Sequence, residues 1–204
     1  MKSNLKLKIT NLIAFCILMV TVGQAQDGPK FGVRVGANIS NQEFKSSSIT
    51  VEPQSKFGLD FAVVADLPLG EVVSFGPELH WLQKGYDIED FNGLGELTGT
   101  LNYLELPLLI KFNFGEEAKF FVMGGPSIGY LLDYKIESNG VELEPNYDFV
   151  NRLELGAHLG AGVGIGPIVI DVRYMLGLSD IAKDDPSFEE IKNTAFGAGI
   201  SLMF

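Results

Sequence analysis

The residues of this sequence that could take part in chemistry form a set of charged and imidazole side chains. They recur at every second position in segments whose intervening residues are apolar, so they project from one face of extended strands. The set holds acids and bases in comparable number, and charges removed from water are tolerated only when they are paired. We therefore predict an internal network of ion pairs made by Arg34, Asp60, Glu78, His80, Glu105, Lys111, Arg152, Glu154, His158, Asp171 and Arg173.

The two histidines of this set raise the alternative of catalysis, in which a histidine works with an acid or a nucleophile. His80 lies toward the loop end of its segment and could act as a general base, whereas His158 near mid-segment suits a buried, hydrogen-bonded histidine. Neither has a nucleophile beside it in sequence, and catalysis also requires a third, orienting group. Neither shows a metal-ligand spacing. We therefore expect no catalytic residue, no metal site and no cofactor.

The elements that must position these side chains have a period of two residues from Phe31 onward, which is typical of strands. The connections between them alternate, long after the first, third, fifth and seventh segments and short after the second, fourth and sixth. Eight strands are expected, at residues 31–39, 57–67, 72–84, 100–114, 119–132, 152–166, 168–176 and 193–204.

The last of these segments shows which face meets which environment. Ile200, Leu202 and Phe204 fall on one side, while the other side is mostly small, with Gly197 and Gly199. A soluble carrier barrel would be apolar inside and polar outside, whereas these charges oppose the apolar faces. Apolar-out alternation with short turns at one end is typical of outer-membrane barrels. We predict an all-β fold, an eight-stranded antiparallel up-and-down transmembrane β-barrel, in which both glycines make room for Arg34 and Arg173.

Three prolines lie inside predicted strands that are paired on both sides, where a missing amide donor is unfavourable. They are Pro77, Pro107 and Pro126. We expect local β-bulges at these positions.

The N-terminus has the pattern of a secretory signal peptide over residues 1–25. Lysines precede an apolar run at 12–22, and Gly23 and Ala25 supply the small residues of a cleavage site. The run is shorter than the roughly 20 residues that a transmembrane helix needs. Cys16 lies within it and Phe15 before it is not small, so we expect a mature chain without thiol, disulfide or lipid anchor. Residues 26–204 are then one barrel domain.

Net charge excludes one class of partner. Removing Lys2, Lys6 and Lys8 with the leader lowers the formal net charge from −11 to −14. Phosphate contacts need clustered lysine and arginine, so we expect no nucleic acid partner.

Several segments of the chain resemble one known family. FGVRVGANIS, LNYLELPLLIKFNF, KFFVMGGPSIGYLL and GAHLGAGVGI followed by IVIDVRYMLGLSDI resemble the PorT-like outer-membrane β-barrel proteins of Bacteroidetes. The resemblance covers nearly all of the mature chain and includes Pro107 and Pro126. It implies an OmpA-like eight-stranded barrel in the cell outer membrane. It implies little about activity, since some relatives are associated with protein secretion, and no catalytic residues carry over.

These observations predict a non-enzymatic integral outer-membrane barrel with a plugged, charged lumen, serving envelope structure or partner binding through its external loops. The expected partners are outer-membrane lipid and the barrel-assembly machinery, for which the terminal Phe204 resembles a recognition signal, with other envelope or secretion proteins as further candidates. We expect a monomer. The alternative is an outer-membrane enzyme that acts on lipid or peptide with His80 as its base.

Overall fold

The computed structural model describes residues 28–45, 53–89, 95–115, 118–143, 147, 150–182 and 190–204. The predicted leader, residues 1–25, lies outside this part of the chain. Within the described ranges, no helix has the length and the apolar character needed to cross a bilayer. The described residues form nine strands: β1 (Lys30–Lys45), β2 (Gln54–Pro68), β3 (Val73–Ile88), β4 (Leu97–Phe114), β5 (Ala118–Ser138), β6 (Val141–Leu143), β7 (Leu153–Ile165), β8 (Ile168–Gly177) and β9 (Glu190–Met203).

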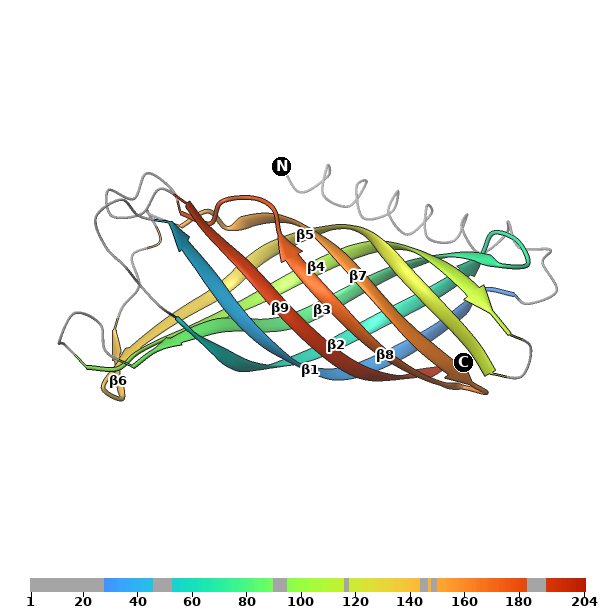
Figure 1. The fold of residues 1–204 in the computed structure, drawn as a ribbon, viewed down its shortest axis with the longest axis horizontal. Helices are drawn as coiled ribbons and strands as arrows, with labels where there is room; N and C mark the ends of the chain where they lie inside the picture. Colours follow the sequence, from blue (N-terminus) through green and yellow to red (C-terminus); the bar gives the residue numbers. More distant parts are fainter. Residues whose placement is uncertain are drawn as a thin grey trace, which may run out of the picture.

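All nine strands belong to one antiparallel sheet in which the first strand pairs with the last. The order is β4-β3-β2-β1-β9-β8-β7-β5-β6, and β4 also pairs with β5, which closes the barrel (Figure 1). β6 lies outside the closed wall, on the end of β5. The wall therefore has eight strands, and the predicted eight-stranded antiparallel up-and-down barrel is confirmed.

The two ends of the barrel differ in their connections. The strand ends joined by short connections, Pro68 and Val73, Phe114 and Ala118, and Ile165 and Ile168, lie at one end, the short-turn end. The strand ends that flank the longer connections, Lys45 and Gln54, Ile88 and Leu97, Leu143 and Leu153, and Gly177 and Glu190, lie at the other, the long-loop end. Phe204 and Phe31 exchange backbone hydrogen bonds of 2.7 and 3.1 Å, so β1 and β9 meet at the short-turn end.

The strands on one side extend further toward the long-loop end than the sequence predicts. β3, β4 and β5 continue through the glycine-rich and acidic stretches that the sequence pattern indicates as loops, and β5 returns as the unpredicted hairpin strand β6. The reason is an apolar cluster on their inner face, made by Tyr86, Ile88, Leu101, Tyr103 and Leu131. Burying these side chains stabilises the extension.

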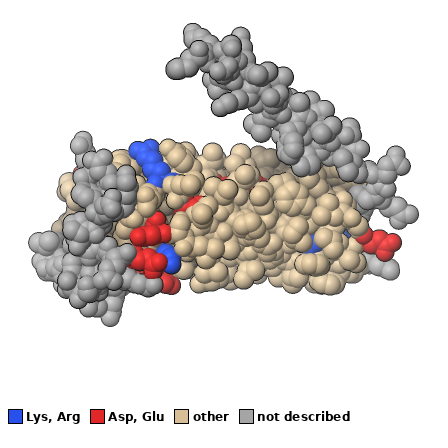
Figure 2. All heavy atoms as spheres, turned by 90° about the horizontal axis from the view of Figure 1, so that it is seen from above, with Lys and Arg blue, Asp and Glu red and all other residues tan. Residues whose placement is uncertain are grey.

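The outer wall of the barrel is apolar. Val63, Leu159 and Ile200 point outward and are 59%, 57% and 53% exposed. On the face shown in Figure 2, most charged side chains lie toward the two ends, and the length between them is almost entirely uncharged. A continuous apolar surface of this extent is unfavourable in water and suits lipid.

The three prolines do not shift the strand register, so the prediction of bulges at these positions is wrong. Pairing keeps one register from Pro77↔Leu108 to His80↔Glu105 and from Pro107↔Ser127 to Ile110↔Gly124, and Pro126↔Ala157 lies within an unbroken ladder. A proline has a backbone angle compatible with a strand, so its cost here is one missing amide donor. The register shifts lie elsewhere, between Ser55 and Asp60 and between Asn102 and Tyr103.

Candidate functional site: the charged lumen

The structure brings all but one of the predicted charged residues into the interior of the barrel. Each projects inward from its strand because it alternates with an outward apolar neighbour. All but Lys111, which is mostly buried, are nearly inaccessible to solvent. The inward set comprises Arg34 on β1, Asp60 on β2, Glu78 and His80 on β3, Glu105 and Lys111 on β4, Glu154 and His158 on β7, and Asp171 and Arg173 on β8.

Six of these side chains form a closed ring of contacts, which we call the lumen ring. Arg34 donates from Nε and Nη2 to the two carboxylate oxygens of Asp171, at 3.0 and 2.9 Å, and from Nη1 to Asp60. Arg173 donates from Nε to Asp171 and from Nη1 to Glu78, both at 2.8 Å. The order round the lumen ring is Arg34, Asp60, His80, Glu78, Arg173 and Asp171.

His80 closes the lumen ring because both of its nitrogens face carboxylates. Nδ1 lies 2.7 Å from Asp60 Oδ1, and Nε2 lies 2.8 Å from Glu78 Oε2. Only an imidazolium can donate from both nitrogens. In that form the lumen ring holds three cations and three carboxylates and is electrically balanced. Neither nitrogen of His80 remains available to take a proton from a substrate.

A second group of polar side chains lies nearer the long-loop end, centred on Lys84, and we call it the Lys84 cluster. Lys84 Nζ lies 3.2 Å from Glu105 Oε2 and 3.4 Å from Glu154 Oε1. His158 Nε2 lies 2.8 Å from Glu105 Oε1, and Asn193 donates to Glu154 Oε2 at 3.0 Å. The ammonium also lies 5.1 Å from the ring centroid of Tyr103, a cation–π contact.

Lys84 and Asn193 are functional positions that the sequence prediction missed. The predicted strand ends at Lys84, yet Lys84 stands at even spacing from Glu78 and His80, and continuing the alternation places it inward. Asn193 carries no charge, and nothing in its spacing distinguishes it from other inward polar residues.

The prediction for Arg152 is wrong. This residue precedes β7 and is exposed, and its guanidinium lies 4.6 Å from the ring centroid of Tyr147. The alternation of β7 begins at Leu153, which pairs with Tyr130, so the predicted pattern ran one residue too far. Arg152 therefore makes its contact with Tyr147 at the long-loop end, outside the lumen.

The two inward glycines of β9 differ. Gly199 makes room for an arginine as predicted, and Gly197 does not. A Cβ built at Gly199 would overlap the guanidinium of Arg34, which crosses this strand to reach β8. A Cβ at Gly197 would instead meet Met175 Cε at 3.1 Å, so Gly197 does not make room for Arg173. Arg173 instead lies beside Gly160, where an added Cβ would lie 3.1 Å from the Cβ of Arg173.

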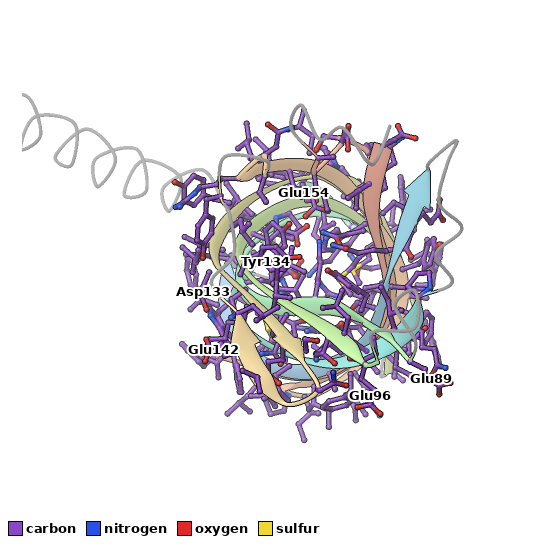
Figure 3. The ribbon with its side chains drawn as sticks, turned by 90° about the vertical axis from the view of Figure 1, so that its left-hand side faces the viewer. Glu89, Glu96, Asp133, Tyr134, Glu142 and Glu154 are labelled. Atoms are coloured by element: carbon purple, nitrogen blue, oxygen red, sulfur yellow. The ribbon has the colours of Figure 1, made fainter. Side chains whose placement is uncertain are left out.

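The two ends of the lumen are closed to different degrees. At the long-loop end, the apolar cluster that includes Leu101 and Leu131 adjoins the Lys84 cluster, because its member Tyr103 contacts the Lys84 ammonium. Figure 3 looks into this end: side chains fill the interior, and Glu89, Glu96 and Glu142 lie around its rim. At the short-turn end, a cavity of about 300 Å³ reaches up to Glu78, Asp171 and Arg173 of the lumen ring. Among the described residues, no three acidic, histidine or cysteine side chains are grouped as a metal ion would require.

The family of the chain follows from comparison with known proteins. Residues 24–183 match the family described as outer membrane protein beta-barrel domain. The chain belongs to this family. This outer-membrane barrel is located in the outer membrane, and by the topology of its class the short-turn end faces the periplasm and the long-loop end faces outward.

Solved structures of other outer-membrane barrels are similar to this chain at low sequence identity. Neisserial surface protein A is 14% identical, with a TM-score of 0.53 over 87% of this chain and 100% of the other. Ail of Yersinia pestis is 17% identical, with a TM-score of 0.45 over 86% and 98%. The outer membrane enzyme PagL is 9% identical, with a TM-score of 0.44 over 83% and 98%. No curated protein matches the sequence. At these identities the likeness concerns the fold.

Proposed function

We propose that this outer-membrane barrel is non-enzymatic, that its lumen is closed by its own charged side chains, and that it serves envelope structure or binds partners through its external loops. The lumen ring is the observation that carries the proposal. It joins residues of β1, β2, β3 and β8 across the interior, and each of its carboxylates has two charged or imidazole partners in the lumen ring. The interior of an eight-stranded barrel is only wide enough to be filled by side chains.

The energetics of these contacts support a closed lumen. For an ion to pass, several buried ion pairs would have to separate together, and leaving one buried charge without its partner costs about 3–5 kcal/mol. The apolar cluster at the long-loop end adds a second obstacle, because Leu101 and Leu131 are 2% and 0% exposed. This arrangement supports a barrel that does not conduct.

The surroundings of both histidines favour a structural role over catalysis. His80 uses both nitrogens on carboxylates, and His158 uses Nε2 on Glu105. His158 Nδ1 and the Ser127 hydroxyl lack a hydrogen-bond partner in the described structure, but these residues are 1% and 3% exposed. A serine and a histidine can act on lipid or peptide only where a substrate reaches them, which this burial opposes.

The external end is the surface that we assign to partners. The β5–β6 extension carries Glu137 and Glu142 beyond the apolar wall, and the rim adds Glu89 and Glu96. The resemblance of the sequence to PorT-like barrels makes a secretion-associated partner the finer candidate. We assign outer-membrane lipid to the apolar wall and the barrel-assembly machinery to the closing strand with Phe204, and we propose a monomer.

Site-specific cross-linking in intact cells tests where the partner contact lies. A photo-cross-linking residue would replace Glu89 or Glu142 at the external end, and Glu71, which is exposed on a short turn, provides the matched control. We expect a defined cross-linked protein from the external positions and not from position 71. Identical products from all three positions would contradict external partner binding.

Turnover assays test the non-enzymatic part of the proposal. The folded wild type and His80→Gln are incubated with outer-membrane lipids and with peptides. We expect no turnover by either protein above that of empty micelles. Turnover by the wild type that His80→Gln abolishes would overturn the proposal in favour of an enzyme.

A further inference from the structure

The cavity at the periplasmic end, which we call the vestibule, is lined by more cationic than anionic side chains. Four cationic side chains line it, Lys30, Lys111, Lys119 and Arg173, against the three carboxylates of Asp66, Glu78 and Asp171. Glu78 and Asp171 are already bound within the lumen ring. The vestibule is therefore electrostatically suited to an anion.

Lys111 supplies the clearest open donor. Its side chain is 12% exposed, and its Nζ lies 3.7 Å from Glu78 Oε1 and 4.0 Å from Asp66 Oδ1. Both distances exceed the range of a hydrogen bond. An ammonium has three N–H donors, and Lys111 makes no hydrogen bond with any residue that the structure describes. Its remaining contact is with the Phe121 ring, whose centroid lies 5.8 Å away.

Arg173 offers a second donor beside the same carboxylate. Its Nε and Nη1 bind Asp171 and Glu78, while its Nη2 donates to no residue in the described ranges. Arg173 and Lys111 approach different oxygens of Glu78, and both line the vestibule, so each brings an open donor to the Glu78 end of the cavity. A carboxylate placed there would accept charge-assisted hydrogen bonds, the stronger kind in proteins.

The walls of the vestibule are partly apolar. Phe121 and Met123 project from β5, and Val169 from β8 packs against them. Ligand sites commonly combine such apolar walls with a few polar groups that fix orientation. At about 300 Å³, the vestibule has room for a compact molecule.

We propose that the vestibule is a periplasm-facing binding site for a small organic acid. The carboxylate lies on Lys111 Nζ and Arg173 Nη2, and the apolar body packs against Phe121 and Met123. This site goes beyond the proposed function, because binding at one end requires no passage through the lumen ring.

Fluorine NMR on the full barrel in lipid nanodiscs tests the site, with 4-fluorophenylacetate as the probe. We expect saturable binding, and about tenfold weaker binding by Lys111→Met, since one hydrogen bond to a charged group is removed. Lys111→Arg keeps the charge and should bind like the wild type. The matched control is Lys135→Met, which removes an exposed external lysine that pairs with Glu142. Heat-modifiable gel mobility verifies that each variant is folded.

Three results would overturn the site. The first is signal change no greater than in empty nanodiscs, and the second is wild-type affinity in folded Lys111→Met. The third is equal affinity for the uncharged 4-fluorophenylacetamide, which would indicate apolar partition alone. Competition by inorganic phosphate as strong as by unlabelled phenylacetate would exclude the organic-acid class. None of these outcomes bears on whether the lumen is closed, so this site can fail while the proposed function stands.

Discussion

The lumen ring and the Lys84 cluster arise from the same alternation of inward polar residues, yet they differ in how their contacts are connected. In the lumen ring, each carboxylate contacts two partners, so removing one partner leaves the other. In the Lys84 cluster, one ammonium lies between Glu105 and Glu154, and the remaining partners are the imidazole of His158 and neutral groups such as Asn193. The free energy of unfolding should therefore depend more on Lys84 than on any single member of the lumen ring.

Replacing the central cation should have the largest effect. Lys84→Met leaves two buried carboxylates without their ammonium, and we expect a loss of about 3–5 kcal/mol in the free energy of unfolding. Urea unfolding in lipid vesicles would measure it through Trp81, the one tryptophan of the chain. Adding Glu154→Gln should recover part of the loss. A loss below that of opening the lumen ring would contradict the comparison.

Opening the lumen ring should cost less. His80→Gln leaves Asp60 bound to Arg34 and Glu78 bound to Arg173, so we expect a loss of about 1–3 kcal/mol in the same unfolding measurement. A larger loss than in Lys84→Met would show that the closed connectivity gives no protection.

Crowding the lumen ring without removing a charge sharpens the comparison. In Gly199→Ala the new methyl group would overlap the Arg34 guanidinium, which the lumen ring holds in place, and we expect a loss of about 1–3 kcal/mol. Gly164→Ala is the matched control, because its Cβ would lie 3.6 Å from Val169 Cγ2, an ordinary contact. We expect that control to stay within about 0.5 kcal/mol of the wild type. Equal losses would indicate a general intolerance of inward alanine.

Arg152 should show the smallest effect, because it lies outside both groups. Arg152→Ala removes a cation–π contact with Tyr147 at an exposed position, which is worth about 0.5–1 kcal/mol. Unfolding of the variant beside Lys84→Met gives the comparison directly. A loss as large as that of Lys84→Met would place Arg152 in the interior after all.

Alternation was sufficient to predict the barrel, its strand number and the inward face of most charged residues. It was not sufficient for the strand ends, because the extension of β3 to β5 depends on packing among Tyr86, Leu101 and Leu131 from different strands. The same limit explains the wrong prediction for Arg152: the alternating pattern includes this residue, but β7 begins at Leu153.

Which inward charges meet could not be predicted from the period. Alternation assigns a face, but the height of a side chain in the lumen depends on the stagger between strands. Arg34 and Asp171 are 137 positions apart and meet because β1 pairs with β9 and β9 with β8, with Gly199 between them. No local signal in the sequence specifies that contact.

Conductance across a planar bilayer tests the closed lumen most directly. We expect the folded wild-type barrel to give no sustained open-channel current in either orientation, because the lumen ring, the Lys84 cluster and the external apolar cluster fill the interior. The matched control is a bilayer that received the same detergent without protein. Stable, voltage-independent current through the wild type, scaling with salt concentration, would contradict the account.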